Sequence, residues 1–480
     1  MLELQIPGLR ERSVPIQSAL RQALVLAIGE GRLTAGQKLP PPRALAGQLG
    51  VARNTVTAAY DELVARGYVN SVERRGYFVA EGLDARPAAA AAPGVDWGAR
   101  LRIAPGALPQ IEKPADWQAY PYPFIYGQVD PGLFPISVWR GCSRAALGRS
   151  ALDYWAADRA MEDDPMLLEQ IRRHVLPARG IFAARDEVMI TLGAQHGLYL
   201  LSRLLAGPGT EVGVELPGYP DTRNVFQLGG ARLRPLPVDG EGLRMDDAAM
   251  RGLAALVVTP AHHCPSMVTL SDARRAELLA LARRHDTVVI EDDYEGEICF
   301  GAPRPALKAA DRDGRVVYLG TLSKILAPGV RLGYMVAPAP LLAEARALRR
   351  LMHRSAPLNN QRTAAIFLAE GHYLGLVRSM RAALEERWRL VDAGLDRLLP
   401  RFRRAPATGG TAFWLECPVD ARAFAARAAA HGVMVESGDP FVGAEARGRF
   451  IRLGISYIDK ARIGPGLELL ARAAAELGAG

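Results

Sequence analysis

A stretch rich in alanine, proline and glycine, from Glu81 to about Trp117, divides this chain of 480 residues into two unequal parts. The stretch has too few large apolar side chains to bury a core of its own, and such a composition is typical of a linker. We therefore assign residues 81–118 to a linker and expect residues 13–80 and 119–480 to fold separately. The chain is long enough for two or three domains.

The composition is that of an ordinary globular protein, with 49% hydrophobic and 23% charged residues. The net charge of +8 comes almost wholly from arginine, and a general preference for arginine over lysine explains it as well as phosphate partners do. The four cysteines lack CxxC spacing, so neither a disulfide framework nor a metal site is predicted. Residues 1–17 lack the apolar core of a signal peptide, and no apolar run is long enough for a membrane span. We expect a cytoplasmic protein that does not enter membranes.

The first part has the pattern of three helices followed by a strand pair. Apolar residues recur at helical spacing and stop at glycines, and prolines stand where they are tolerated in a first helical turn. A charged tip separates the two strand-like runs, as in a hairpin. The predicted helices span residues 16–28, 43–49 and 54–66, and the predicted strands span residues 68–69 and 77–79.

The segment from Leu33 to Val69 resembles the winged helix-turn-helix of the GntR family of bacterial transcription regulators. The resemblance implies that double-stranded promoter DNA is a partner. A recognition helix presents its first-turn residues to base edges and phosphates, and arginines at a wing tip reach the backbone or the minor groove. A basic helical bundle with no DNA-binding role is the alternative. The predicted DNA-contacting residues are Arg43, Arg53, Asn54, Thr55, Thr57, Arg74 and Arg75.

In the second part, short apolar runs alternate with helical stretches, which indicates an α/β domain with a mainly parallel sheet. From about Arg381 the chain is rich in helix and then returns to strands, which indicates a smaller α+β lobe. The predicted strands are residues 188–190, 212–214, 256–258, 288–290, 316–318, 411–416 and 450–453.

Lys324 is one of five lysines among 59 basic residues, and it lies in the segment TLSKILAPGVRLGY, residues 321–334. Small hydroxyls precede the amine, and a turn with an arginine follows it. This arrangement suits an aldehyde cofactor that carries a phosphate, and it suggests pyridoxal 5'-phosphate. A buried amine near an arginine has its charged form disfavoured, which keeps it nucleophilic enough to form a Schiff base.

Further segments around Lys324 resemble the fold-type I, aspartate aminotransferase-like family of pyridoxal phosphate proteins. In that family a helix start cradles the phosphate, an aromatic ring stacks on the pyridine, and a carboxylate holds the pyridine nitrogen protonated. Taken singly, each segment has an ordinary structural alternative, such as a turn, a core tyrosine or an acidic loop. The resemblance implies these cofactor contacts: Ala194, Gln195, Tyr219, Asp292, Tyr294, Thr321, Ser323 and Arg331.

Arg452 matches the arginine that binds the substrate carboxylate in that family, with a structural ion pair as the alternative. Asp221 adds a negative charge near this end, and Arg223 is its expected counter-ion. The family's ring-contacting asparagine is missing from the segment at residues 259–267, where His262 is the expected replacement. A metal site in the adjacent His-His-Cys run is less favoured, because neighbouring residues rarely converge on one ion.

A winged helix joined by an Ala/Pro linker to such a domain resembles the MocR subfamily of GntR regulators. The implied fold is α/β: an N-terminal winged helix-turn-helix, then a fold-type I aminotransferase-like large domain with a smaller C-terminal α+β lobe. The resemblance implies a homodimer, head to tail. We hypothesise that a small amine or amino-acid effector forms an external aldimine in exchange for Lys324 and so repositions the heads on DNA.

Two other functions stay open. The chain could be a working aminotransferase, which we favour less because of the DNA-binding head, or a sensor of pyridoxal phosphate itself. The sequence does not separate a carboxylate effector from a sulfonate, nor activation from repression.

Overall fold

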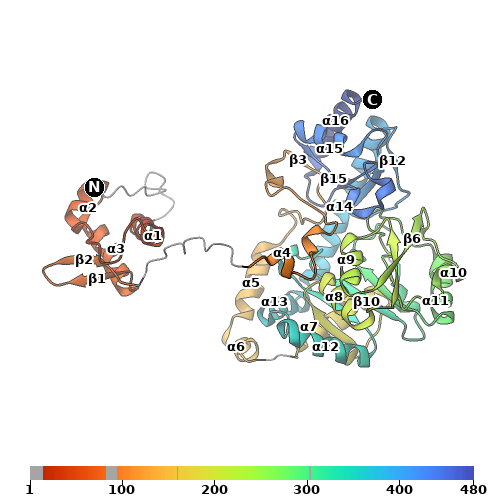
Figure 1. Ribbon diagram of the computed structural model, residues 1–480, viewed down its shortest axis with the longest axis horizontal. Helices are drawn as coiled ribbons and strands as arrows, with labels where there is room; N and C mark the ends of the chain where they lie inside the picture. The colour runs from red at the N-terminus through yellow and green to blue at the C-terminus, as the bar shows by residue number, and fades with distance from the viewer. Residues whose placement is uncertain (1–14, 83–94, 159–160, 302–303, 480) are drawn as a thin grey trace. The chain divides into compact units, whose positions relative to one another are not determined.

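The computed structural model describes residues 15–82, 95–158, 161–301 and 304–479. The chain divides into two compact units, one ending at Arg102 and the other beginning at Ile103 (Figure 1). Residues 83–94 of the predicted linker lie outside the described residues. Residues 95–102 of that segment belong to the first unit, and the part from Ile103 onward belongs to the second.

The described part of the first unit holds a small helical bundle and a strand pair. The apolar face of its third helix is fully buried at Val56, Tyr60 and Leu63, and the hydroxyl of Tyr60 donates to the carbonyl of Pro40 at 3.0 Å. These residues join the helices into one core. The elements are α1 (Ile16–Gly29), α2 (Pro42–Leu49), α3 (Arg53–Ala65), β1 (Val69–Val72), β2 (Gly76–Val79) and the single turn α4 (Trp97–Arg100).

A sheet of eight strands forms the centre of the second unit, in the order β4-β11-β10-β9-β8-β5-β6-β7. The strands from β10 to β6 run parallel, β11 is antiparallel to both of its neighbours, and β7 is antiparallel to β6. The mainly parallel sheet agrees with the sequence pattern. Its strands are β4 (Val188–Thr191), β5 (Glu211–Leu216), β6 (Arg232–Asp239), β7 (Gly242–Leu243), β8 (Ala255–Val258), β9 (Val288–Asp293), β10 (Val316–Thr321) and β11 (Gly333–Val336).

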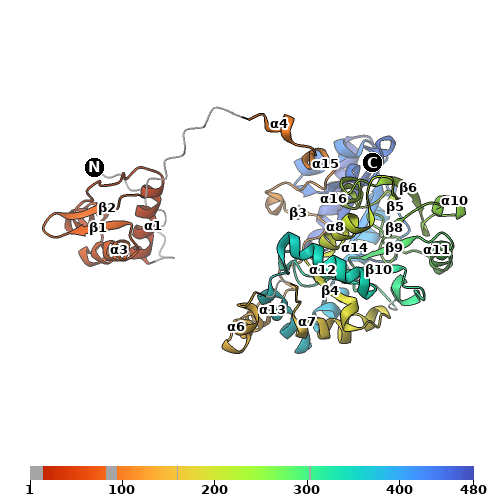
Figure 2. The same cartoon turned by 60° about the horizontal axis from the view of Figure 1, so that its bottom comes forward.

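Helices cover both faces of this sheet, as its buried strands require (Figure 2). Val289 on β9 packs with Leu278 of α11, whereas the next residue, Ile290, packs with Leu198 of α8 and Leu342 of α12. The helices are α5 (Ile136–Ala146), α6 (Arg149–Trp155), α7 (Pro165–Gln170), α8 (Ala194–Leu205), α9 (Pro220–Leu228), α10 (Asp247–Met250), α11 (Asp272–Arg284), α12 (Ala339–His353), α13 (Leu358–Ala369) and α14 (His372–Leu398). Short turns are η1 (Pro105–Ala107), η2 (Trp117–Ala119), η3 (Ile171–Val175), η4 (Pro177–Arg179), η5 (Arg185–Glu187), η6 (Leu307–Ala310) and η7 (Pro328–Val330).

The C-terminal lobe contains an antiparallel sheet in the order β12-β13-β16-β15 and a parallel pair of β3 and β14. The long helix α14 packs against both α13 and α16 and so connects the lobe to the large domain. No helix in the described ranges is long and apolar enough to cross a membrane. The lobe's elements are β3 (Tyr122–Pro123), β12 (Arg403–Arg404), β13 (Ala412–Glu416), α15 (Ala421–Ala430), β14 (Val433–Met434), β15 (Glu436–Ser437), η8 (Asp439–Phe441), η9 (Ala444–Ala446), β16 (Phe450–Gly454) and α16 (Lys460–Glu476).

Candidate functional site

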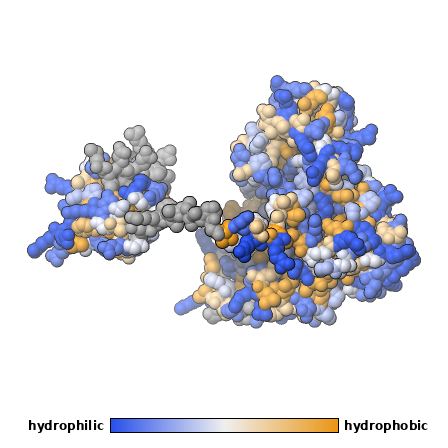
Figure 3. Space-filling model, in the orientation of Figure 1, coloured by the Kyte–Doolittle hydropathy of each residue, from blue (hydrophilic) through white to orange (hydrophobic). Residues whose placement is uncertain are grey.

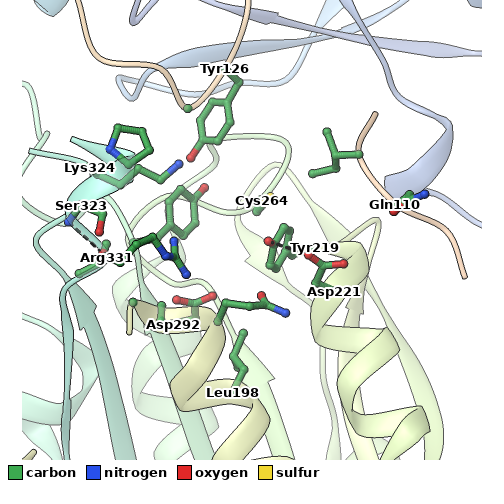
Figure 4. Close-up of a pocket in the computed structure, with 18 of the residues that line it drawn as sticks. Gln110, Tyr126, Leu198, Tyr219, Asp221, Cys264, Asp292, Ser323, Lys324 and Arg331 are labelled. Atoms are coloured by element: carbon green, nitrogen blue, oxygen red, sulfur yellow. Dashed lines mark hydrogen bonds between the residues drawn. The ribbon is translucent and has the colours of Figure 1, made fainter. Parts of the chain in front are cut away.

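A pocket of about 420 Å³ lies where the parallel strands of the large sheet end (Figure 4). The C-terminal ends of parallel strands meet at one edge of the sheet. This edge brings together Asp292 at the end of β9, Thr321 at the end of β10 and Tyr219 in the loop after β5. Arg331 reaches the same edge because it precedes the antiparallel strand β11. The ten residues predicted for cofactor and effector all line this pocket: Ala194, Gln195, Tyr219, Asp292, Tyr294, Thr321, Ser323, Lys324, Arg331 and Arg452.

One corner of the pocket is suited to an anion. Gly193 has a φ of 88°, and a Cβ built on it would stand 3.5 Å from the guanidinium of Arg331, which donates to the carbonyl of Leu192 at 2.8 Å. In the described structure no side chain caps the first turn of α8. The backbone N–H groups of Ala194 and Gln195 therefore point, with the helix dipole, toward any anion held there.

Two hydroxyls line the wall next to this corner. Thr321 and Ser323 each donate to the carbonyl of Leu332 at 3.3 Å, and the backbone N–H of Ser323 donates to the Thr321 hydroxyl at 3.1 Å. These bonds fix the positions of both oxygens.

Lys324 extends into the pocket with its Nζ 4.2 Å from the centre of the Tyr126 ring. Burial lowers the pKa of this amine, the positive charges of Arg452 and Lys113 lower it further, and the negative charge of Glu295 acts in the opposite direction. A lowered pKa increases the neutral fraction of the amine, which is its nucleophilic form.

Two adjacent carboxylates at the end of β9 have different surroundings. Asp293 accepts hydrogen bonds from Nε of Arg179 at 2.8 Å and from the hydroxyl of Tyr318 at 2.7 Å. Asp292 is buried, yet its Oδ1 has no hydrogen-bond partner among the described residues. Burial first, and then the charge of Asp293, raise the pKa of Asp292 to about 7. Asp292 therefore offers an unmatched acceptor to an N–H group in the pocket.

Further polar groups on the wall are without a partner. The hydroxyl of Tyr294 and Oε1 of Gln195 have none within the part of the chain that the structure describes. The hydroxyl of Tyr219, in contrast, donates to Oδ2 of Asp221 at 3.1 Å, and Nδ2 of Asn224 donates to Oδ1 at 3.2 Å. Both oxygens of Asp221 thus have donors, whereas Tyr294 and Gln195 are available to a ligand.

Arg452 projects from β16 and is 1% exposed. Its Nε donates to Oε2 of Glu436 at 2.8 Å, and its guanidinium carbon lies 4.0 Å from the ring centre of Tyr126 and 4.5 Å from that of Phe441. Neither terminal nitrogen of the guanidinium has a partner among the residues described. These two buried donors match the geometry of an acid group.

Two sequence expectations were wrong. At the loop that replaces the family's asparagine motif, Cys264 lines the pocket, whereas Nε2 of His262 lies 3.0 Å from the carbonyl of Ile298. The loop at residues 259–267 is irregular, so sequence spacing alone did not predict which of its side chains faces the pocket. Arg223 is not the counter-ion of Asp221, because its guanidinium donates to backbone carbonyls instead.

The His-His-Cys run is not arranged around one ion. Nδ1 of His263 lies 2.6 Å from the hydroxyl of Ser266, and its Nε2 lies 3.0 Å from the carbonyl of Pro217. Across the described ranges, no three His, Cys, Asp or Glu side chains are grouped to hold a metal.

The segment from Ile103 to Gly127 contributes pocket residues that the sequence reasoning missed. Lys113 and Tyr126 line the pocket, and the amine of Lys113 donates to the carbonyl of Tyr126. The composition of residues 81–118 assigns Lys113 to the linker. The signal that could have pointed to Lys113 is that lysine is rare in this chain.

The predicted DNA contacts lie in the first unit, and most are at its surface. Thr55 and Thr57 are half-buried in α3, and the hydroxyl of Thr57 donates to the carbonyl of Arg53 at 3.1 Å. The turn between β1 and β2 forms the wing tip. The exposed members of the set are Arg43, Arg53, Asn54, Arg74 and Arg75.

Both units resemble known families. Residues 16–79 match the bacterial regulatory proteins of the gntR family, and residues 164–463 match aminotransferase class I and II. The chain is 44% identical to the HTH-type transcriptional regulator TauR of Rhodobacter capsulatus, over 95% of this chain and 96% of that protein. It is 32% identical to the probable rhizopine catabolism regulatory protein MocR of Rhizobium meliloti, over 82% of this chain and 83% of the relative.

Solved aminotransferases share the fold of the second unit. LysN, an alpha-aminoadipate aminotransferase of Thermus thermophilus complexed with N-(5'-phosphopyridoxyl)-L-leucine, superposes with a TM-score of 0.70 at 26% identity, over 80% of this chain and 100% of that one. The kynurenine aminotransferase of Pyrococcus horikoshii gives a TM-score of 0.67 at 27% identity, over 74% and 90%.

Fold and site together define a DNA-binding transcription regulator with an aminotransferase-like domain. The chain belongs to the GntR family of bacterial regulators, in its MocR subfamily. The predicted family and fold class are confirmed, and so is pyridoxal phosphate as the cofactor. The pocket fits that cofactor: Lys324 offers an amine to its aldehyde, Asp292 an unmatched acceptor to its pyridine nitrogen, and the start of α8 an anion corner to its phosphate.

Proposed function

We propose that this regulator senses a small amine or amino acid in its pyridoxal phosphate pocket and thereby changes its occupancy of promoter DNA in the bacterial cytoplasm. The supporting observation is a winged helix-turn-helix in the same chain as a pocket with Lys324 and with polar groups that lack partners among the described residues. When bound, the cofactor supplies an aldehyde carbon that bonds reversibly to primary amines. The effector's amine would displace the amine of Lys324 from that carbon and leave Lys324 as a free amine.

Each pocket residue has a role in this proposal. Asp292 would accept a hydrogen bond from the protonated pyridine nitrogen, Tyr294 would donate to the phenolate oxygen, and Tyr219 would pack against the ring. Arg452 binds the acid group of the effector. The phosphate is bound by Ala194, Gln195, Thr321, Ser323 and Arg331.

Hydrogen bonds between the lobes suggest how effector binding is transmitted. Arg223 donates to the carbonyl of Gly218 at 3.1 Å and to that of Phe441 at 3.0 Å, and the backbone N–H of Gly218 donates to Phe441 at 2.9 Å. These hydrogen bonds thus connect the loop that carries Tyr219 to the C-terminal lobe. Once Lys324 is released and Arg452 engaged, the lobes shift relative to each other.

We further propose that the protein acts as a head-to-tail homodimer. The second unit exposes large apolar side chains to solvent, and apolar residues are visible on its surface in Figure 3. Exposed apolar side chains mark an interaction site where they gather into one patch. The exposed large apolar residues of the second unit include Ile136, Leu147, Phe182 and Leu351.

The proposed DNA contacts divide into two classes. Arg53, Asn54, Thr55 and Thr57, at the start of α3, contact base edges and nearby phosphates in the major groove. Arg43, Arg74 and Arg75 contact the DNA backbone, or the minor groove at the wing.

Replacing Lys324 tests the proposal. In the wild-type protein, an amine that alters DNA binding should also change the absorbance spectrum of the bound cofactor. Lys324→Ala should abolish the DNA response, because no lysine amine is left for the effector to displace, even where the cofactor's aldehyde still reacts with the amine and changes its absorbance. Lys460→Ala, at an exposed lysine paired with Glu386, serves as the control and should retain both. The proposal fails if the amine changes the DNA binding of Lys324→Ala as much as it changes that of the wild type.

A working aminotransferase is the second candidate, because all of the predicted cofactor residues line one pocket. Steady conversion of an amino acid and a keto acid, with no footprint on promoter DNA, would decide for the enzyme. A footprint without turnover decides for the regulator. If pyridoxal phosphate without any amine shifts DNA binding, the cofactor itself is the signal.

A further inference from the structure

We infer that Lys113 completes, together with Arg452, a subsite for the acid group of the effector, and that this acid group carries a single negative charge. The inference rests on the proposed function, and it assigns a role to a residue outside the family motifs. It also restricts that acid group to monoanions, such as a carboxylate or a sulfonate.

Three cations surround the backbone at Tyr126 and Gly127. Nζ of Lys324 lies 4.2 Å from the Tyr126 ring centre, and the guanidinium carbon of Arg452 lies 4.0 Å from the same point. A Cβ built on Gly127 would stand 3.2 Å from Nζ of Lys324 and 3.7 Å from Nζ of Lys113. An amine that replaces Lys324 would therefore have its acid group, a few bonds away, within reach of the other two cations.

Arg452 and Lys113 both have N–H donors that are not used by the described residues. The terminal nitrogens of Arg452 are buried and have no partner among the described residues, because only Nε is bonded to Glu436. The amine of Lys113 has three N–H donors, and its described contacts are the carbonyl of Tyr126 and Oε1 of Glu436, at 3.5 Å for the latter. A third donor is left for a ligand.

The charges at this end of the pocket determine the charge of the ligand. Lys113 and Arg452 contribute two positive charges, and Glu436, with its side chain 2% exposed, contributes one negative charge. Asp221 also lines the pocket and keeps its negative charge, because Tyr219 and Asn224, which donate to its oxygens, are neutral groups. Lys113 and Arg452 together exceed Glu436 by one positive charge, which a single anion neutralises, and Asp221 repels a second negative charge on the ligand. A dianion would bury an uncompensated negative charge, which is costly.

The first test uses the full-length protein with its cofactor and follows amine binding by cofactor absorbance. The probes are β-alanine, 2-aminoethanesulfonate and propylamine, which has no acid group. Lys113→Met should weaken the two acid-bearing amines about tenfold and leave propylamine unchanged. Lys113→Arg should recover most of the affinity, and Lys460→Met, the matched exposed lysine, should bind as the wild type does.

Two outcomes of this titration overturn the inference. If Lys113→Met binds the acid-bearing amines as tightly as the wild type does, Lys113 is not part of the subsite. An equal loss for propylamine assigns Lys113 a merely structural role. Charge selectivity is tested with 2-aminoethylphosphonate at pH 8, where it is mostly dianionic: it should bind about tenfold more weakly than the monoanions. Tighter binding contradicts the charge assignment.

A second measurement separates this inference from the proposed function. If no amine changes the cofactor spectrum of the wild type, the proposed function fails. Propanoate, which carries the acid group and no amine, still probes the subsite. It should raise the melting temperature of the wild type more than that of Lys113→Met. Equal shifts, or no shift in either protein, overturn the subsite whatever the amines do.

Discussion

At the scale of single residues, Glu215 is a buried carboxyl behind the loop that carries Tyr219. It accepts hydrogen bonds from the backbone N–H of Thr259 at 3.1 Å and from its hydroxyl at 2.5 Å. Burial raises the pKa of Glu215 from 4.5 to about 8. Between pH 4.5 and about 8 the folded protein therefore keeps a proton on Glu215 that the unfolded chain has released. The contribution of this carboxyl to stability falls as the pH rises through that range.

We predict that Glu215→Gln loses this pH dependence, because an amide does not ionise. Relative to the wild type, the variant should gain about 2–4 kcal/mol in unfolding free energy between pH 5 and pH 9. Denaturant unfolding at the two pH values measures the gain. An equal difference between variant and wild type at both values contradicts the assignment.

The sequence predicted some pocket residues and not others for a physical reason. Asp292 lies near the end of β9 and Arg331 shortly before β11, in segments that resemble the family's motifs, so the resemblance was enough to name them. Lys113 and Glu436 come from an irregular segment and from a strand of two residues, and only tertiary folding brings them together. The functional roles of all of these residues stay predictions.

At the scale of elements, the wing between β1 and β2 exposes Arg74 and Arg75 on its turn. Each phosphate contact releases counterions, so we predict that Arg74→Ala and Arg75→Ala each reduce the slope of log affinity against log salt by about 1. Binding to promoter DNA at several salt concentrations measures this slope. Arg66→Ala is the control, because this arginine lies beyond α3 and pairs with Glu62 at 2.6 Å. Unchanged slopes in the wing variants would remove the wing from the interface.

The predicted elements agree with the structure where the apolar pattern is regular. The helices of the head begin and end within one or two residues of their predicted bounds, and all of the predicted strands of the large sheet are present. β6 was not predicted, because Pro235 and Pro237 and its arginines are atypical of a strand. β11 has only four residues and overlaps the end of the Lys324 segment, so its sequence gave no separate signal.

At the scale of the whole molecule, the two units each have a hydrophobic core of their own. Because the cofactor pocket lies within the second unit, we predict that removing pyridoxal phosphate lowers the melting temperature of one calorimetric transition only. A ligand at a hundred times its dissociation constant contributes about 2.7 kcal/mol to the unit that binds it. Scanning calorimetry before and after cofactor removal measures the shift. Equal shifts of both transitions would show that the units unfold as one.

The central claim, that amine exchange at Lys324 controls DNA binding, is tested most directly by following both events in one sample. A candidate effector is titrated into the cofactor-loaded protein with labelled promoter DNA, while cofactor absorbance and DNA anisotropy are recorded together. We predict that both signals change with the same midpoint, because one binding event drives them. A change in anisotropy without a spectral change, or at a clearly different effector concentration, would contradict the claim.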